Sequence, residues 1–225
     1  MTRVRTLICA ALTLAAGACA SSPPIHYLSL DDGQPAAAGS PIGVSVAVTQ
    51  ANLPDLIDRP QLVVRSSGHQ LQISEQYEWA EPLRRQVPRV IARDLGAALD
   101  SGRVVALPID AQDFDPDFKV MLDIQRLDVV AGQGVDLDVV WRVEPRDGRT
   151  FFGRSMVRQA IETTSGPGDY PALVAAENLA LRAVAANIAE GIKGWGDDTA
   201  VHGSSAPSDS APADLCGGMG GRDGI

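Results

Sequence analysis

Histidine and cysteine are scarce in this chain, with three of each among 225 residues. The histidines are His26, His69 and His202, and no cysteine stands at metal-ligand spacing from any of them. The Gly-x-Ser-x-Gly turn that presents a hydrolase nucleophile is also absent. These absences argue against a metal centre and against a histidine-based hydrolase. We therefore predict no cofactor, no bound metal and no enzymatic activity.

Long apolar runs are missing as well. The apolar run Leu7–Ala16 is far shorter than the roughly 20 residues of a bilayer-spanning helix. It follows two arginines and leads into small residues that end at Cys19, which is the layout of an export signal. The site resembles the lipobox of bacterial lipoproteins, in which this cysteine is acylated, although Ala16 stands where leucine is commonest. An ordinary secretory signal cut after Ala18 is the alternative, and both interpretations export the protein.

The cysteine count also excludes an internal disulfide. Cys9 would leave with the signal, Cys19 would be acylated in the lipoprotein interpretation, and Cys216 would then remain alone near the C-terminus. The signal removes two of the 19 basic residues and no acidic ones, so the mature chain has 17 against 28, a net charge of −11. Such an acidic chain is a poor ligand for nucleic acid, and we predict no nucleic-acid partner.

Acylation would hold the mature protein at a membrane, because several acyl chains together give stable anchoring. Ala20 follows the cysteine, where an aspartate would favour retention in the inner membrane by analogy with Gram-negative lipoprotein sorting. We therefore expect the periplasmic face of the outer membrane. From Cys19 to Ile25 the chain spans at most ~20 Å, so the folded domain should lie close to the bilayer.

Alternation of apolar and polar residues predicts a sheet of about six or seven strands. Its expected parts are short strands at His26–Leu30, Ile42–Val48 and Arg103–Leu107, a hairpin at Leu62–Ser74, and an antiparallel meander over Phe118–Ile161. The meander is expected to contain a bulge near Arg126 and to turn at Asp147-Gly148.

Apolar residues at three- and four-residue spacing predict two long helices, Ala80–Leu99 and Pro171–Lys193. Pro88 should kink the first helix, and Gly194 should end the second. The fold class is then α/β (α+β): a single domain with a mixed, largely antiparallel sheet packed by two long helices. The expected organisation is a signal peptide at 1–18, a tether at 19–24, the domain at 25–194 and a disordered acidic tail at 195–225.

Two motifs go beyond composition, LPDLIDRPQLVVR at Leu53–Arg65 and WAEPL at Trp79–Leu83. Together with the lipobox and the Tyr27-Leu28 segment, they resemble the ABC-type transport auxiliary lipoprotein family (PqiC-like) over roughly Tyr27–Lys193. The resemblance implies a non-catalytic subunit of a lipid transport system that supports membrane integrity. It would brace the hydrophobic conduit of a PqiB-like MCE-domain protein at the outer membrane, and a homo-oligomer matching a ring-shaped partner is compatible with this role. An envelope hydrolase and a stand-alone lipid carrier are the alternatives.

The two motifs also contain the candidate partner-binding residues: Asp55, Asp58, Arg59, Trp79 and Glu81. Asp58 and Arg59 suit a docking surface and suit equally an ion pair that fixes the start of the next strand. Trp79 suits a core anchor better than a binding hot spot, although tryptophan is common at both. Glu81 is a favourable charge near the first turn of a helix.

One acidic cluster has the composition of a calcium site: Asp110, Asp113, Asp115 and Asp117. It lacks the central glycine and the terminal glutamate of an EF-hand loop. We therefore interpret this segment as a solvated loop.

Overall fold

The computed structural model describes residues 23–31, 33, 39–40, 43–107, 114–161 and 168–202, with side chains described as far as Trp195. Eight strands and two helices occupy these residues. In chain order they are β1 (His26–Leu28), β2 (Val46–Asn52), β3 (Gln61–Ser67), β4 (Gln70–Trp79), α2 (Leu83–Leu99), β5 (Val104–Ala106), β6 (Phe118–Val130), β7 (Gly134–Pro145), β8 (Phe151–Ala160) and α3 (Tyr170–His202).

All eight strands belong to one mixed sheet organised around β6. One edge of β6 pairs antiparallel with β7 along nearly its whole length, and β7 pairs in the same way with β8. The other edge of β6 pairs in parallel with β2 and, at Val130, with β3. The strands β5, β4 and β1 complete the sheet, of which β1–β4 and β2–β5 are parallel pairs and β3–β4 is antiparallel. The predicted α/β (α+β) class is confirmed, with eight strands in place of six or seven.

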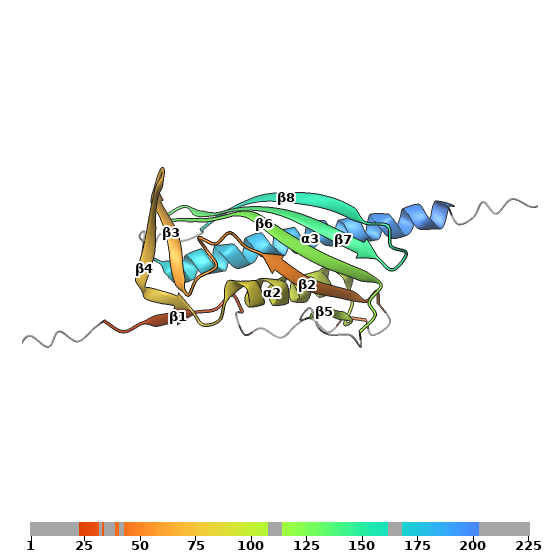
Figure 1. The fold of residues 1–225 in the computed structure, drawn as a ribbon, viewed down its shortest axis with the longest axis horizontal. Helices are drawn as coiled ribbons and strands as arrows, with labels where there is room; N and C mark the ends of the chain where they lie inside the picture. The colour runs from red at the N-terminus through yellow and green to blue at the C-terminus, as the bar shows by residue number, and fades with distance from the viewer. Residues whose placement is uncertain are drawn as a thin grey trace, which may run out of the picture.

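The two helices cover one face of this sheet, and the opposite face of β6, β7 and β8 remains open (Figure 1). The helix α2 packs against β2 and β5, whereas α3 packs against β7 and β8 and also contacts α2. The alternation in β7 explains this layering, because every second residue is buried beneath α3 while the residues between them are half-exposed. The buried residues of β7 that line the core are Val135, Leu137, Val139, Trp141 and Val143.

The meander and the first hairpin are confirmed. The β6–β7 register shifts between Ile124 and Arg126, which places the predicted bulge. The hairpin of β3 and β4 turns at Gly68, whose positive φ of 46° suits glycine. The strand β4 is longer than predicted, however, and ends only at Trp79.

Other boundaries differ from the sequence predictions as well. The strand predicted at Ile42–Val48 is β2, which begins at Val46 and continues to Asn52. The first helix begins at Leu83 rather than Ala80, because residues up to Trp79 pair in the sheet. That helix continues through Pro88, which lies on its buried side.

The second helix does not end at Gly194 but runs to His202, so the first part of the predicted tail is helical. Packing explains the extension. The Trp195 ring stacks on Phe151 with ring centroids 4.9 Å apart, and the Arg149 guanidinium lies 4.7 Å from the Trp195 ring. Such aromatic and cation–π contacts continue to hold the helix against the sheet beyond the glycine. Residues 203–225 lie outside the described part of the chain.

The helix α3 is long and apolar enough over Tyr170–Trp195 to cross a bilayer by composition alone. Its apolar stripe is buried against the sheet and α2, however, including Leu181, Val184 and Ile188. These contacts identify it as the core helix of the domain.

Candidate functional site

The segment between β2 and β3 forms a tight turn whose sequence is the first half of the LPDLIDRPQLVVR motif. The Pro54 carbonyl accepts hydrogen bonds from the backbone N–H groups of Ile57 and Asp58, at 3.0 and 3.2 Å. Ile57 is buried and fixes the turn to the core, whereas Asp55 and Leu56 at its tip are exposed. One apolar residue thus holds a polar surface loop in place.

The second motif lies directly beside this turn. The Trp79 N–H donates a hydrogen bond to the Pro60 carbonyl at 2.7 Å, which joins the end of β4 to the start of β3. The Trp79 side chain is only 5% exposed and belongs to the hydrophobic core. Trp79 therefore supports the surface from below and presents no ring to a partner.

A cleft of about 850 Å³ opens between the turn and the first half of α2. Its walls come from four places: the end of β2, the turn, the helix and the residues after β5. The lining side chains that bear charge are Asp58, Arg84, Arg85 and Arg89. Its apolar lining includes Leu53, Pro88 and Leu107.

The charge of this cleft is positive. Arg84 lies 3.5 Å from Asp58, and Arg89 lies 2.6 Å from Glu81, so two of the arginines are partly neutralised. No described residue lies within ion-pair distance of Arg85, which is exposed. The cleft is therefore a cationic surface on an acidic protein.

The start of α2 adds to the positive charge of the cleft. Pro82 at the N-cap offers no side-chain hydrogen bond, and the first turn has no acidic residue. Instead it has Arg84 and Arg85, which face the positive end of the helix dipole. Positive side chains at the positive end of a helix dipole destabilise the helix. Such an arrangement is typical of a surface that binds a negatively charged group.

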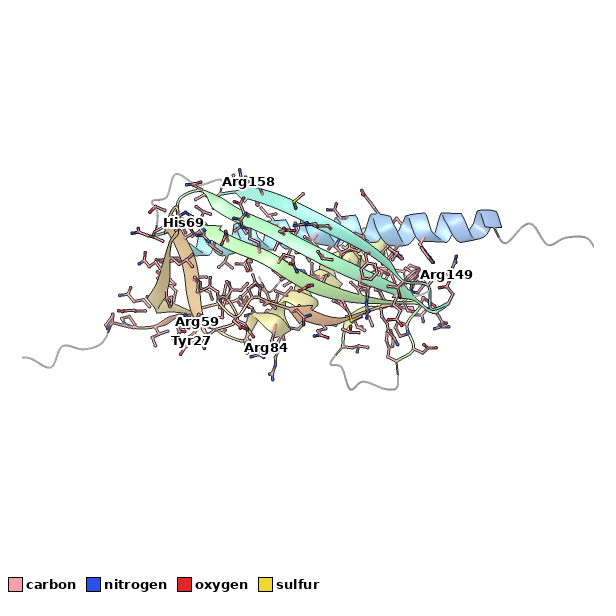
Figure 2. The ribbon with its side chains drawn as sticks, turned by 45° about the horizontal axis from the view of Figure 1, so that its top comes forward. Tyr27, Arg59, His69, Arg84, Arg149 and Arg158 are labelled. Atoms are coloured by element: carbon pink, nitrogen blue, oxygen red, sulfur yellow. The ribbon has the colours of Figure 1, made fainter. Side chains whose placement is uncertain are left out.

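Of the five predicted partner-binding residues, one lines the cleft and the other four lie on the segments next to it. Asp58 lines the cleft, and Glu81 reaches it through its pairing with Arg89. Arg59 is half-buried, and its Nε has no hydrogen-bond partner among the described residues. Asp55 is exposed on the adjoining turn, while Trp79 is buried. Figure 2 shows Arg59 and Arg84 on the same side of the molecule.

Sequence analysis did not single out the arginines Arg84, Arg85 and Arg89, which fall outside the apolar stripe of the helix. The signal was the position of Arg84 and Arg85 immediately after Pro82, with no acid in the first turn to balance them. Only the tertiary structure shows that β2 and the turn form the other walls of the cleft. The candidate lipidation residue Cys19 lies outside the described residues.

In the described part of the acidic cluster, the aspartates make ion pairs and hydrogen bonds with other residues of the domain. Arg146 lies 3.3 Å from Asp115 and 3.6 Å from Asp117. Asp117 also accepts hydrogen bonds from the Ser45 hydroxyl and N–H, and these bonds lower the pKa of its carboxyl. Asp110 and Asp113 lie outside the described residues, and no group of three potential ligands is found within the described part.

The two histidines whose side chains are described, His26 and His69, have no catalytic residue beside them in that part of the chain. The His26 ring stacks on Tyr77, with centroids 5.1 Å apart. His69 occupies the exposed turn of the β3–β4 hairpin. Neither is paired with a nucleophile, so the described residues offer no support for a histidine-based hydrolase.

Comparison with known families decides what kind of protein carries this cleft. A family model described as the ABC-type transport auxiliary lipoprotein component matches residues 27–189. The chain belongs to this family. The match covers both motifs and the whole cleft, and it confirms the resemblance predicted from the sequence. The protein is thus an auxiliary component of ABC-type transport, and its lipoprotein family indicates association with a membrane of the cell envelope.

Two solved structures share the fold. One is an uncharacterised protein, 18% identical, with a TM-score of 0.58; the alignment covers 76% of this chain and 99% of that chain. The other is a protein of Xanthomonas campestris, 21% identical, with a TM-score of 0.51, covering 80% of this chain and 96% of that chain. No curated protein matches the chain.

Proposed function

We propose that the auxiliary lipoprotein is an outer-membrane-anchored subunit of an MCE-type lipid transporter. Cys19 carries the acyl chains, and the domain stands on the periplasmic side, where it docks the conduit of a PqiB-like MCE-domain protein. The role is one of binding and support for envelope integrity, without catalysis. Membership of the transport auxiliary family is the observation that carries this proposal.

The cleft at the start of α2 supplies the docking surface. Its unpaired Arg85 and the partly neutralised Arg84 and Arg89 complement carboxylates on a partner, while Leu53 and Pro88 offer apolar contact. Charge complementarity of this kind raises association rates and selects among partners. Asp55, on the exposed turn, lies at the rim of the same surface.

Co-purification tests the partnership. The tagged protein, extracted with detergent from the native envelope, should retain an MCE-domain protein through washing. The variant Arg85→Gln should reduce this recovery several-fold, because it removes the unpaired charge of the cleft. Arg158→Gln is the matched control, since Arg158 is exposed on β8 and pairs with Asp136 among the described residues. Background recovery with the unmodified protein, or equal recovery with the two variants, would contradict the proposal.

Fractionation tests the anchor. Cys19→Ala should move the protein from the membrane fraction to the soluble fraction and remove the acyl mass from its N-terminus. Cys216→Ala should change neither property. An unmodified protein whose intact mass shows no acyl chain would refute the proposed anchoring.

A further inference from the structure

On the face of the sheet that the helices leave uncovered, a group of exposed apolar side chains lies at the N-terminal end. Residues paired across neighbouring strands point to the same face, so the register identifies which side chains share it. The relevant pairs are Tyr27 with Glu78, Gln61 with Glu78, Val63 with Ile73, and Arg65 with Leu71. Tyr27, Ile73 and Leu71 therefore lie on one face of β1, β4 and β3.

An irregularity in β4 makes this possible. From Ile73 to Glu78 the strand β4 takes five residue steps, whereas β3 takes only two from Gln61 to Val63. The Ser74 hydroxyl accepts hydrogen bonds from the backbone N–H groups of Gln76 and Tyr77, which stabilises the extra residues. The bulge thereby brings Ile73 to the same face as Tyr27.

The apolar side chains of this face are exposed. The exposed fractions are 47% for Ile25, 65% for Tyr27, 38% for Leu71 and 46% for Ile73. We call these four residues the N-terminal apolar patch. Exposed apolar side chains that occur singly are common on protein surfaces. A group of four at one end of a sheet instead indicates an interaction surface.

The rest of the same face is mixed: it carries ion pairs and also the exposed side chains of Phe152 and Met156 on β8. Bidentate hydrogen bonds join Arg154 to Asp138 and Arg158 to Asp136. Asp128 of β6 pairs with Arg65, next to the patch.

The length of the chain before the patch identifies what covers it. From Cys19 to Pro23, the first described residue, there are four residue steps, which reach at most ~14 Å. The chain enters at the end formed by β1 and the β3–β4 hairpin, while α3 leaves at the opposite end (Figure 1). Figure 2 shows Tyr27 and His69, the hairpin turn, at that N-terminal end. A lipid anchored at Cys19 must enter the bilayer beside the patch.

We infer that the N-terminal apolar patch is a membrane-contact surface that rests on the lipid bilayer. The inference depends on the proposed acylation of Cys19. Ile73 and Leu71 contact the acyl-chain boundary, and Tyr27 lies at the level of the headgroups, where tyrosine is favoured. This contact fixes the orientation of the domain, with the end of α3 that holds Trp195 directed away from the membrane.

Quenching by brominated lipid tests the contact. The acylated protein is reconstituted into vesicles of phosphatidylethanolamine and phosphatidylglycerol with brominated acyl chains. Ile73→Trp reports on the patch, and Phe152→Trp is the matched control, because Phe152 is exposed on β8 of the same sheet face. After subtraction of the fluorescence of the natural tryptophans, Ile73→Trp should show several-fold greater fractional quenching than Phe152→Trp. Matching circular dichroism spectra verify that both variants are folded.

Equal quenching of the two variants, or none for Ile73→Trp, would overturn the inference. So would an Ile73→Trp emission that is already shifted to the blue in solution and depends on protein concentration, since this would assign the patch to a second copy of the chain. The intact mass of the same preparation separates the two proposals. If it lacks acyl mass, the anchoring proposal fails, and a maleimide lipid coupled to Cys19 of the mature Cys216→Ser protein then supplies the anchor for the same comparison.

Discussion

Glu177 should make this protein less stable as the pH rises from mildly acidic to mildly alkaline. Its side chain is completely buried on α3, and neither carboxyl oxygen has a hydrogen-bond partner among the described residues. Burial without a partner disfavours the charged form and raises the pKa of Glu177 from 4.5 to about 8. The folded protein therefore holds this carboxyl protonated at neutral pH.

The sign of the effect follows from proton linkage. Between pH 4.5 and about 8 the folded state binds a proton that the unfolded state has released, so the free energy of unfolding falls as the pH rises. At about 1.4 kcal/mol for each tenfold difference in proton affinity, the loss across this range is on the order of 5 kcal/mol. Such a loss is a large fraction of the 5–15 kcal/mol that is typical of folded proteins.

Urea unfolding followed by circular dichroism at pH 5, 6.5 and 8.5 measures this loss. Glu177→Gln should abolish most of the decline, because glutamine keeps the shape of the protonated acid but has no proton to lose. Its advantage over the unmodified protein should be small at pH 5 and reach several kcal/mol at pH 8.5. Glu190→Gln, at an exposed position of the same helix, is the control and should leave the pH profile unchanged. Parallel profiles for the unmodified protein and Glu177→Gln would refute the reasoning.

Three further predictions concern packing, hydrogen bonding and acid stability. Gly153→Ala should lower the free energy of unfolding by about 1–3 kcal/mol in thermal or urea melts, because a Cβ there would overlap the Trp141 ring. Gln86→Ala should cost about 1–3 kcal/mol and speed amide exchange at Leu30, whose N–H donates to the Gln86 Oε1 at 2.8 Å. Asp117→Asn should cost on the order of 1 kcal/mol at pH 7, because its partly exposed carboxylate loses charge-assisted hydrogen bonds. That cost should disappear as the pH falls below the ordinary aspartate value of 3.8 and through the lowered pKa of Asp117 in the folded state.

Each of these predictions has a contradicting result. Gly168→Ala, with open space at its Cβ position, should leave the free energy of unfolding nearly unchanged. If Gly153→Ala and Gly168→Ala change it equally, the steric explanation is excluded. Gln133→Ala tests an exposed glutamine, and faster exchange at Leu30 in both glutamine variants would exclude a specific bond from Gln86. A cost of Asp117→Asn that persists at pH 2 would show that its charge contributes nothing.

The meander was predictable because its signals are local. The alternation from Val135 to Val143 depends only on one strand having a buried face, and Asp147-Gly148 marks its turn. The start of the second helix has a local signal too, because the Asp169 side chain just before it accepts a hydrogen bond from the Ala172 N–H. The end of that helix was not predictable, because Trp195 continues it through contacts with β8 and the preceding turn.

The candidate site was predictable only in part. The motif residues Asp58 and Glu81 are joined to the cleft by ion pairs with Arg84 and Arg89, which periodicity alone assigns to solvent. The path of the chain between β2 and β3 decides which helix residues line the cleft. The burial of Trp79 was predictable, because a core anchor was the favoured interpretation of this residue, and the structure confirms it.

The sequence by itself determined the net acidity and the α/β (α+β) plan, because these depend on composition and on short-range periodicity, and its two motifs indicated the family. Tertiary structure alone decided the cationic cleft, the unpaired burial of Glu177 and the N-terminal apolar patch. These three features join residues that are far apart in the chain, or depend on strand register. The physical reason is that burial and electrostatic potential are properties of neighbours in space, which a pattern along the chain does not specify.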